Sequence, residues 1–418
     1  MRPWGWNIRL ALYFLLLAGL LGLAGCGTDS SLSSLQGALV NNTQAVEVNL
    51  GPAGNTVNGI FTSVTICEPG TSTCQTIPNV LVDSGTEGLR LLSSATTLSL
   101  PAVTVNSNAL QECVSFADGS YVWGAVMSAD IELAREKARS VPVQLIDSSS
   151  PTQYPVPSAC TSGGGSDLNT VAALGANGLL GIGLFRQDCG LTCTLLTRPN
   201  MYYLCPSSGC QSTTTPLRSQ LQNPVWMFPQ DNNGVLISLP SIPDAGARTV
   251  PGLLIFGIGT QSNNDLGSAI VYTADANGNF TTTYNGIAYT QSYIDSGSDA
   301  YYFLNSVKVG MLPCTNNPGL YCPSLPALNY PPTFTVTNAG QNGALGQVTF
   351  SIDNADLLFS ANGGLNAAFN DIGGPSGAII SPLDYFDFGV PFFYVRNVFV
   401  GIENKTGPNG VVGPYWAY

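Results

Sequence analysis

The chain has 418 residues and no histidine. This absence excludes Ser-His-Asp and Cys-His catalysis and histidine-ligated zinc or haem sites, so acid–base chemistry would need carboxylates, tyrosine, cysteine or one of three lysines. The net charge is −12, which argues against nucleic-acid binding because phosphates require Lys and Arg. With 47 glycines, 28 prolines and 9% charged residues, the composition indicates a globular, turn-rich chain that is poor in helix.

The first 25 residues have the pattern of an export signal. Arg2 and Arg9 supply positive charge, and the 14 residues Leu10–Leu23 are apolar, a length typical of a signal peptide rather than a membrane span. The run ends in Leu23-Ala24-Gly25-Cys26, which resembles the bacterial lipobox. That resemblance implies cleavage before Cys26 and attachment to a lipid bilayer through acylated Cys26. An ordinary signal peptide or a buried segment is the alternative.

The residues after Cys26 indicate where the mature chain is located. Residues 26–44 are expected to form a flexible tether because most of them are polar. Gly27 follows Cys26, and the absence of Asp there favours the outer membrane in a Gram-negative host. Cleavage would leave 11 basic and 25 acidic residues, a net charge of −14. We therefore expect a lipid-anchored protein of the bacterial cell envelope, at the outer membrane or facing the periplasm.

The rest of the chain alternates short β-rich runs with turns rich in Gly, Pro, Asn and Ser, which predicts an all-β protein. The clearest runs are Val46–Leu50, Gly59–Ile66, Val80–Val82, Val141–Ile146, Leu253–Ile258, Ala269–Tyr272, Gln347–Ile352 and Phe392–Ile402. Only Ile131–Arg139 has helix-forming composition. A hairpin that turns near Glu136 is the alternative, and we favour it for a reason given below.

Ten cysteines follow Cys26, an even number for an exported chain, and they predict five disulfides. Cys67 and Cys74, and likewise Cys314 and Cys322, each flank a turn that contains Pro and Gly. Cys113 and Cys160 pair by elimination. The remaining four allow three connectivities among themselves: Cys189, Cys193, Cys205 and Cys210. A metal cluster is the rival interpretation, but without histidine we expect no metal.

A long-range duplication is the strongest feature of the sequence. Asp-Ser-Gly occurs twice, at Asp83–Gly85 and at Asp295–Gly297, each time after a β-type run and before a hydroxyl residue and an acid. An apolar stretch that ends in Gly181 follows the first copy, and one that ends in Gly389 follows the second. The separations from the aspartates are 98 and 94 residues. The two halves are therefore predicted to form two similar lobes.

The duplication has a chemical consequence. An aspartate at the end of a strand, followed by Ser and Gly, presents its carboxylate from a rigid turn. Two such turns at a pseudo-two-fold axis would bring Asp83 and Asp295 within hydrogen-bonding distance, where they would share a proton. One carboxylate could then activate water while the other protonates a carbonyl oxygen. Such a pair hydrolyses amides without histidine, metal or another cofactor.

These motifs resemble those of the pepsin-like aspartic peptidases. Phe116-Ala117-Asp118-Gly119-Ser120 resembles the flap motif of that family, and a strand pair follows the flap there, which is why we favour the hairpin near Glu136. Four further segments are similar to family segments and occur in the same order: Gly59–Leu92, Asn177–Gly183, Leu254–Gly259 and Phe388–Glu403. The resemblance extends over most of the mature chain. The nearest match is expected to be a bacterial lipoprotein branch of the superfamily.

The resemblance implies a fold and a role for each matching residue. It implies an all-β, bilobal double barrel with an N-terminal lobe over residues 45–250 and a C-terminal lobe over residues 251–418. Asp83 and Asp295 would be catalytic. The supporting residues would be Ser84 and Ser296, which brace the loops, Gly85 and Gly297, which form the turns, and Thr86 and Ser298, which bond the outer carboxylate oxygens. The flap residues would be Phe116, Gly119, Ser120 and Tyr121.

Several residues differ from the family pattern. Phe116 lacks the hydroxyl of the usual flap tyrosine, and Tyr121 either compensates or is only a strand residue. Glu87 and Asp299 replace small polar residues and should raise the pKa of the pair. Arg90, where the family often has Trp, would neutralise Glu87, bind a substrate carboxylate or face solvent.

The leading function is an aspartic endopeptidase that acts as a monomer on a polypeptide, with no cofactor. The second is a catalytically inert pepsin-like protein that binds a protein ligand in the same cleft. The third is a structural surface lipoprotein in which Asp-Ser-Gly is only a turn. Close approach of the Asp83 and Asp295 carboxyl groups would support the first two functions and exclude the third.

Overall fold

The structure is a computed structural model, and it describes residues 41–149, 154–197, 200–206, 209–324, 331–376 and 384–418. The predicted signal peptide, Cys26 and most of the predicted tether therefore lie outside the described residues. The tether was predicted to end at residue 44, but the first strand begins at Thr43. In the described residues, no helix combines the length and apolar character that a membrane crossing needs.

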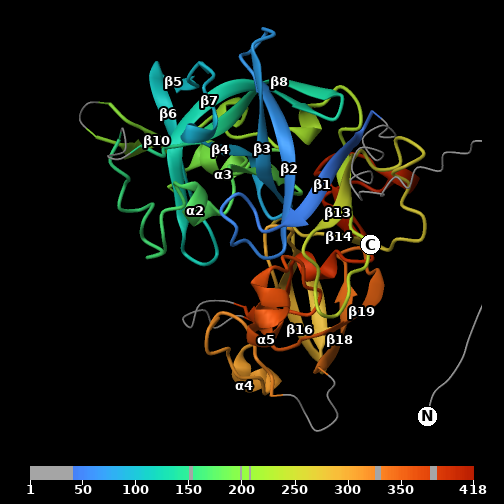
Figure 1. Ribbon diagram of the computed structural model, residues 1–418. Helices are drawn as coiled ribbons and strands as arrows, with labels where there is room; N and C mark the ends of the chain where they lie inside the picture. The colour runs from blue at the N-terminus through green and yellow to red at the C-terminus, as the bar shows by residue number, and fades with distance from the viewer. Residues whose placement is uncertain (1–40, 150–153, 198–199, 207–208, 325–330, 377–383) are drawn as a thin grey trace, which may run out of the picture. The chain divides into compact units, whose positions relative to one another are not determined.

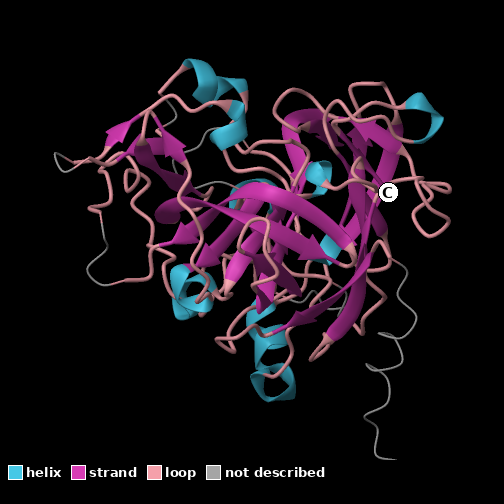
Figure 2. Cartoon of the chain, turned by 90° about the horizontal axis from the view of Figure 1, so that it is seen from above, coloured by secondary structure: helices cyan, strands magenta, loops and turns pink. Residues whose placement is uncertain are grey.

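The architecture is all-β and bilobal, as expected, with a closed six-stranded barrel and a half-barrel. Figure 1 shows β2, β3, β6, β7 and β8 in one lobe and β16, β18 and β19 in the other. The helices are short and lie around the strands (Figure 2). They are α2 (Val171–Leu174), α3 (Leu191–Leu195), α4 (Ser306–Val309) and α5 (Ala355–Ser360).

The strands of the N-terminal half have the following bounds. They are β1 (Thr43–Asn49), β2 (Gly59–Cys67), β3 (Cys74–Asp83), β4 (Glu87–Leu92), β5 (Thr104–Val105), β6 (Asn108–Ser115), β7 (Tyr121–Leu133), β8 (Glu136–Ile146), β9 (Gly178–Ile182), β10 (Tyr202–Leu204), β11 (Gln211–Ser212), β12 (Gly234–Ser238) and β13 (Val250–Phe256). They belong to one large sheet, in which β1 pairs with β2 and with β13, so that β13 joins the N-terminal strands to β12 and β22.

The strands of the C-terminal half are fewer and shorter. They are β14 (Val271–Thr273), β15 (Phe280–Tyr284), β16 (Ile287–Ile294), β17 (Tyr301–Phe303), β18 (Thr333–Ala339), β19 (Leu345–Ser351), β20 (Gly373–Pro375), β21 (Asp387–Phe388), β22 (Asn397–Gly401) and β23 (Tyr415–Ala417). β14, β22 and β23 join the large sheet, and the other seven form a second sheet in the order β19-β18-β15-β16-β21-β17-β20.

The two halves repeat one strand arrangement around each Asp-Ser-Gly loop. In the first half β9 lies between β3, which runs parallel to it, and β4, which runs antiparallel. In the second half β21 lies between the parallel β16 and the antiparallel β17. Gly181 pairs with Asp83, and the main-chain N–H of Asp295 donates to Phe388, the residue before Gly389. The repeated spacing in the sequence therefore reflects a repeated strand pairing.

The glycines that end the two apolar stretches are required by close backbone approach. A Cβ atom at Gly181 would lie 2.6 Å from a main-chain atom of Glu87, and one at Gly389 would lie 2.2 Å from the carbonyl oxygen of Ala300. No side chain fits at either distance. Each glycine therefore lets the chain that follows the Asp-Ser-Gly loop pass across the end of the central strand.

Most strand predictions hold, but three ranges were too long by at least two residues, one of them Leu253–Ile258, whose strand ends at Phe256. The segment Ile131–Arg139 forms a hairpin, because β7 pairs with β8 around a turn at Ala134 and Arg135. The predicted run Ala269–Tyr272 becomes a strand only from Val271. The predicted run Phe392–Ile402 becomes one only from Asn397, because the chain turns at Val395, which has a left-handed φ of 59°.

The five disulfides predicted from the sequence are confirmed. The pairs are Cys67–Cys74, Cys113–Cys160, Cys189–Cys193, Cys205–Cys210 and Cys314–Cys322. The connectivity that the sequence left open is therefore local, within two small loops. The bond between Cys113 and Cys160 is different, because it joins β6 to a segment 47 residues later.

Candidate active site

The two Asp-Ser-Gly loops meet through reciprocal hydrogen bonds. The main-chain N–H of Ser84 donates to Oγ of Ser296 at 2.9 Å, and the N–H of Ser296 donates to Oγ of Ser84 at 2.9 Å. The Ser296 hydroxyl also donates to the carbonyl of Val82, and that of Ser84 donates to the carbonyl of Ile294. Both serines are buried. The loops are therefore locked to each other, in the arrangement that the sequence predicted for these serines.

The interlocked loops bring Asp83 and Asp295 together. A Cβ atom at Gly85 would lie 2.6 Å from the carboxyl group of Asp295, and one at Gly297 would lie 2.8 Å from Oδ1 of Asp83. Each carboxyl group therefore lies against the glycine of the opposite loop, where only a glycine leaves room. A hydrogen bond joins the two carboxyl groups. Such a bond requires a shared proton.

The other bonds to the two carboxyl groups are nearly symmetric. The N–H of Gly85 donates to Oδ1 of Asp83 at 2.8 Å, and the N–H of Gly297 donates to Oδ1 of Asp295 at 2.7 Å. The outer oxygens accept from Thr86 at 2.6 Å and from Ser298 at 3.1 Å. The structure thus places all eight loop residues predicted for the site in one cluster.

The pair retains a proton at neutral pH. The pKa of Asp295 is raised from 3.8 to about 8. Burial is the largest cause, and the neighbouring charge of Asp83 is the next. A carboxylic acid beside a carboxylate can protonate one atom of a substrate while its partner takes a proton from water. The cluster can therefore support acid–base chemistry without histidine or metal.

Three more acids lie near the pair. Burial is the main cause that raises the pKa of Glu87 to about 8, and the charge of Asp83 adds to it. Asp299 is half-buried and has a raised pKa, and it accepts a hydrogen bond from Tyr302 at 2.6 Å. The sequence predicted both of these acids near the pair. It did not single out Asp387, whose carboxyl group lies within hydrogen-bonding distance, 2.7 Å, of the Ser298 hydroxyl.

Asp387 was missed because it lies on a strand far along the chain. A signal was nevertheless present in the duplication: when Gly181 and Gly389 are aligned, Asp387 falls where the first half has Leu179. The strand pairing confirms the correspondence, since Leu179 lies opposite Leu81 and Asp387 lies opposite Tyr293. A charged residue at an apolar position of a repeat is the pattern that would have identified it.

Arg90 neither faces solvent nor forms an ion pair with Glu87, although its charge lowers the pKa of that acid. It is 1% exposed, so it does not face solvent, and its guanidinium pairs with Glu112 at 2.8 Å and with Asp188 at 3.0 Å. It donates to the main-chain oxygen of Glu87 rather than to its carboxylate. Its charge is therefore satisfied inside the protein, and it is not free to bind a substrate carboxylate.

The predicted flap is a hairpin between β6 and β7. Phe116 donates its N–H to Ser120, and the N–H of Gly119 donates to Phe116, which closes the turn. The side chain of Phe116 packs against the apolar cluster that contains Val114 and Val122. The hydroxyl of Tyr121 bonds to Asp167, so Tyr121 is a strand residue with a partner of its own.

The flap turn reaches towards the second half of the molecule. Burial is the largest cause of the raised pKa of Tyr302 in β17, and the charges of Asp299 and Asp387 and that of Asp118 in the flap turn add to it. Asp118 therefore lies within electrostatic range of β17. The disulfide Cys113–Cys160 and the hydrogen bond from Gly165 to Gly119 hold the hairpin to a neighbouring segment.

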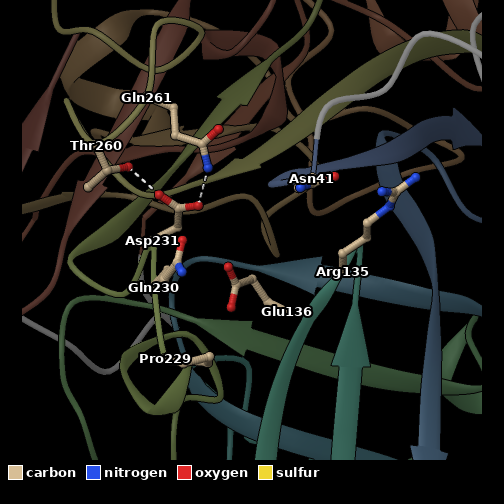
Figure 3. A pocket seen from close by; sticks show the side chains of 8 residues that line it. All are labelled: Asn41, Arg135, Glu136, Pro229, Gln230, Asp231, Thr260 and Gln261. Carbon is tan, nitrogen blue, oxygen red and sulfur yellow. Dashed lines mark hydrogen bonds between the residues drawn. The ribbon is translucent and has the colours of Figure 1, made fainter.

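A pocket of about 210 Å³ is lined by Ser84 and Gly85 of the first loop and by Tyr293 and Ile294, which precede the second loop. Gly85 and Glu87 line it from the first half, and Asn277, Asn279 and Tyr293 line it from the second. A larger cavity of about 540 Å³ lies elsewhere, lined by residues such as Glu136 and Asp231 (Figure 3). No predicted site residue lines that cavity. The smaller pocket therefore borders the first loop, and neither Asp83 nor Asp295 lines it.

Potential metal ligands occur in two groups among the described residues. One contains Cys67, Cys74 and Glu132, and the other contains Cys314, Cys322 and Asp356. In both groups the two cysteines form a disulfide, so their sulfur atoms are not thiolate ligands. Neither group supports the metal-cluster interpretation of the cysteines.

Comparison with known proteins gives a family and a fold. Residues 38–418 match the family described as Protein of unknown function (DUF3443). No curated protein matches the sequence. Among solved structures, the aspartic proteinase from Irpex lacteus is similar with a TM-score of 0.53 and 13% identity, over 90% of this chain and 96% of that chain. At this identity the similarity shows the fold alone. The chain therefore belongs to the DUF3443 family and has a bilobal pepsin-like fold.

Proposed function

We propose that the protein is an aspartic endopeptidase in which Asp83 and Asp295 activate water. The observation that carries this proposal is the hydrogen-bonded contact between two carboxyl groups on loops that also grip each other. The same contact argues against a structural protein in which Asp-Ser-Gly is only a turn, because a turn does not need a second carboxyl group beside it. The pepsin-like fold supports the proposal but shows no activity.

The reaction follows from the protonation of the pair. Asp83 takes a proton from a water molecule, whose oxygen bonds to the peptide carbon, while Asp295 gives its proton to the carbonyl oxygen. The resulting diol collapses when Asp83 passes its proton to the amide nitrogen and Asp295 regains one from a diol hydroxyl. The C–N bond breaks, and an acid and an amine leave. Asp295 is the acid because its pKa is raised to about 8.

Single substitutions at the pair test the proposal. Asp83→Asn and Asp295→Asn keep the side-chain shape but remove one titrating group, and each should lower cleavage of an unfolded protein by at least about a thousandfold. The double variant should be no worse than either single variant, because the two groups act as one unit. Circular dichroism would verify that each variant is folded. Full activity in Asp83→Asn would exclude the mechanism.

The second candidate is a protein that binds a polypeptide in the same cleft without cleaving it. It is favoured by Phe116, which gives the flap turn no hydroxyl, and by the two extra acids Glu87 and Asp299, whose pKa values are raised. The same experiment separates the two. If the folded wild type cleaves nothing at any pH from the acid range up to about 8, near which Asp295 loses its proton, the binding protein is the better account.

We also propose that the chain is a bacterial lipoprotein held in the cell envelope through acylated Cys26. The support is the sequence Leu23-Ala24-Gly25-Cys26 after an apolar run, together with the five disulfides, which suit an oxidising compartment. Cys26→Ser should release the protein from the membrane fraction. If that variant sediments with membranes as the wild type does, the proposal is wrong.

A further inference from the structure

A third carboxyl group is connected to the pair through a single hydroxyl. Oγ of Ser298 lies 3.1 Å from Oδ2 of Asp295 and 2.7 Å from Oδ2 of Asp387. Asp387 is 5% exposed, and its other oxygen, Oδ1, is buried with no hydrogen-bond partner. The Ser298 hydroxyl therefore bridges an acid of the proposed pair and a buried acid of β21.

The hydrogen bonds among Asp83, Asp295, Ser298 and Asp387 determine how many protons these groups hold. A hydroxyl carries one hydrogen, so Ser298 can donate to only one of its two carboxyl neighbours and must accept from the other. The bond between Asp83 and Asp295 also needs a hydrogen. Three hydrogen bonds thus link three carboxyl groups and one hydroxyl, and Ser298 supplies only one of the three hydrogens. Two must come from the carboxyl groups, which leaves one negative charge among the three acids.

We propose that Asp387 is a positioning residue of the site: as a neutral acid it donates its hydrogen to Ser298, so that Ser298 donates to the outer oxygen of Asp295. The catalytic role of Asp387 rests on the proposed function. The statement that Asp387 is protonated does not depend on that function. In the arrangement that satisfies every bond, Asp387 holds one proton and the pair shares the other. Asp387 is then a second protonated acid, which is hydrogen-bonded to Asp295 through Ser298.

The surroundings of Asp387 favour its neutral form. Burial is the first cause that raises its pKa well above the ordinary range, and the charge of Asp295 is the next. The titratable groups that face Asp387 are acids and phenols from the neighbouring loops and strands: Asp83, Asp295, Asp299, Tyr293 and Tyr302. None of these groups is a cation that would favour an ionised Asp387.

The first half of the molecule has no counterpart to Asp387. Leu179 occupies the equivalent place on β9, and Thr86 donates to Asp83 at 2.6 Å. The two loops are nearly symmetric, but the acid behind Ser298 is present on one side only. This asymmetry makes Asp295, rather than Asp83, the member with a second proton within reach.

The arrangement has a consequence for the pH range of activity. Activity falls at high pH when the pair loses its shared proton. In the wild type, a proton from Asp387 can replace it through Ser298, and an ionised Asp387 then opposes further loss by charge repulsion. Asp387 should therefore move the basic limb of the pH–rate profile to higher pH. It should not affect the acid limb, because it is neutral there.

The test compares substitutions in the pH–rate profile for cleavage of an unfolded protein. Asp387→Asn should move the basic limb down by about half a unit to one unit and leave the acid limb unchanged. Asp371→Asn is the matched control, because Asp371 is a buried acid of the same half whose pKa is raised by burial and by Asp353 and Asp244, not by the pair. It should shift neither limb. If Asp387→Asn does not fold, Asp387→Ser should give the same shift.

A second background tests the role of the hydroxyl. In Ser298→Ala the route between Asp387 and Asp295 is broken, so adding Asp387→Asn should shift the limb by less than half as much as it does in the wild type. An equal shift in both backgrounds would overturn the proposed route through Ser298. An unchanged basic limb in Asp387→Asn would overturn the role of Asp387 altogether.

Infrared spectroscopy tests the protonation without needing activity. At about pH 6, well above the ordinary pKa of an aspartate, the difference spectrum between wild type and Asp387→Asn should show loss of a protonated carboxylic acid band. Loss of a carboxylate band would overturn the inference. If the wild type cleaves no peptide, the proposed function fails and this spectrum alone decides the inference.

Discussion

The buried cation Arg90 links three parts of the N-terminal half. It lies on β4, directly after the first loop, and pairs with Glu112 of β6 and with Asp188 of the disulfide-rich segment. Tyr202 donates to the same Asp188 at 2.7 Å. Both carboxyl groups are at most 2% exposed. Removing the cation would leave buried acids without compensation, which is more costly than losing a pair at the surface.

This contrast gives a prediction about stability. Arg90→Met should lower the free energy of unfolding by about 3–5 kcal/mol at neutral pH, because Glu112 and Asp188 would remain buried without their cation. Lys308→Met is the control: Lys308 pairs with Asp384 and is 46% exposed, and its loss should cost less than about 1 kcal/mol. Urea unfolding of the two variants measures both. Equal costs would contradict the assigned role of Arg90.

The sequence predicts some residues of the site better than others. The residues Asp83 to Thr86 and Asp295 to Ser298 were predictable because each group is contiguous and the motif occurs twice. The partners of Arg90 were not, because Glu112 and Asp188 lie 22 and 98 residues away and only folding brings them together. A local pattern identifies residues that act through a local turn. Long-range ion pairs leave no comparable pattern.

At the scale of elements, the loops owe their position to the strands beneath them. β9 is buried along its whole length, and it lies between β3 and β4 just as β21 lies between β16 and β17. The predicted strand runs followed from local composition and the number of disulfides from the cysteine count, whereas the flap hairpin was implied by the resemblance to the pepsin-like peptidases. The two local disulfides in the Cys189–Cys210 segment could not be chosen from sequence, because spacing allowed three connectivities.

The segment between Cys189 and Cys210 extends the flap sheet. β10, which lies within this segment, pairs with β6, and β11 pairs with β10. α3 contains Cys193, which is bonded to Cys189 just before the helix, and it leaves Leu191 and Leu195 exposed. The expected lobe boundary at residue 250 falls at the start of β13, a strand of the sheet that joins the halves. The halves are thus repeated in topology but continuous in their sheet.

At the scale of the whole molecule, the buried acids control how stability depends on pH. The pKa of Glu87 is raised from 4.5 to about 8, that of Asp295 from 3.8 to about 8 and that of Asp371 from 3.8 to about 7, in each case mainly by burial. Between about pH 4.5 and 7 the native state therefore binds more protons than the unfolded state. The contribution of these three acids to stability is full below this window and is lost as pH rises through it.

A measurement of unfolding at several pH values checks this sign. Each such acid should contribute a loss of about 1.4 kcal/mol per pH unit between its unfolded and folded pKa values. Glu87→Gln should flatten the fall of stability between about pH 5 and 8, because the variant has no proton to retain at that position. Asp265→Asn, at an exposed residue, is the control and should leave the slope unchanged. A slope that Glu87→Gln does not alter would contradict the prediction.

The pH–rate profile of the wild type tests most directly whether Asp83 and Asp295 act as one proton-sharing unit. The account predicts a bell-shaped profile for cleavage of an unfolded protein. Activity should fall at low pH when the pair gains a second proton, and it should fall near pH 8 when the pair loses its only one, because the pKa of Asp295 is raised to about 8. Activity that stays undiminished far above pH 8, or a profile with a single limb, would contradict the account.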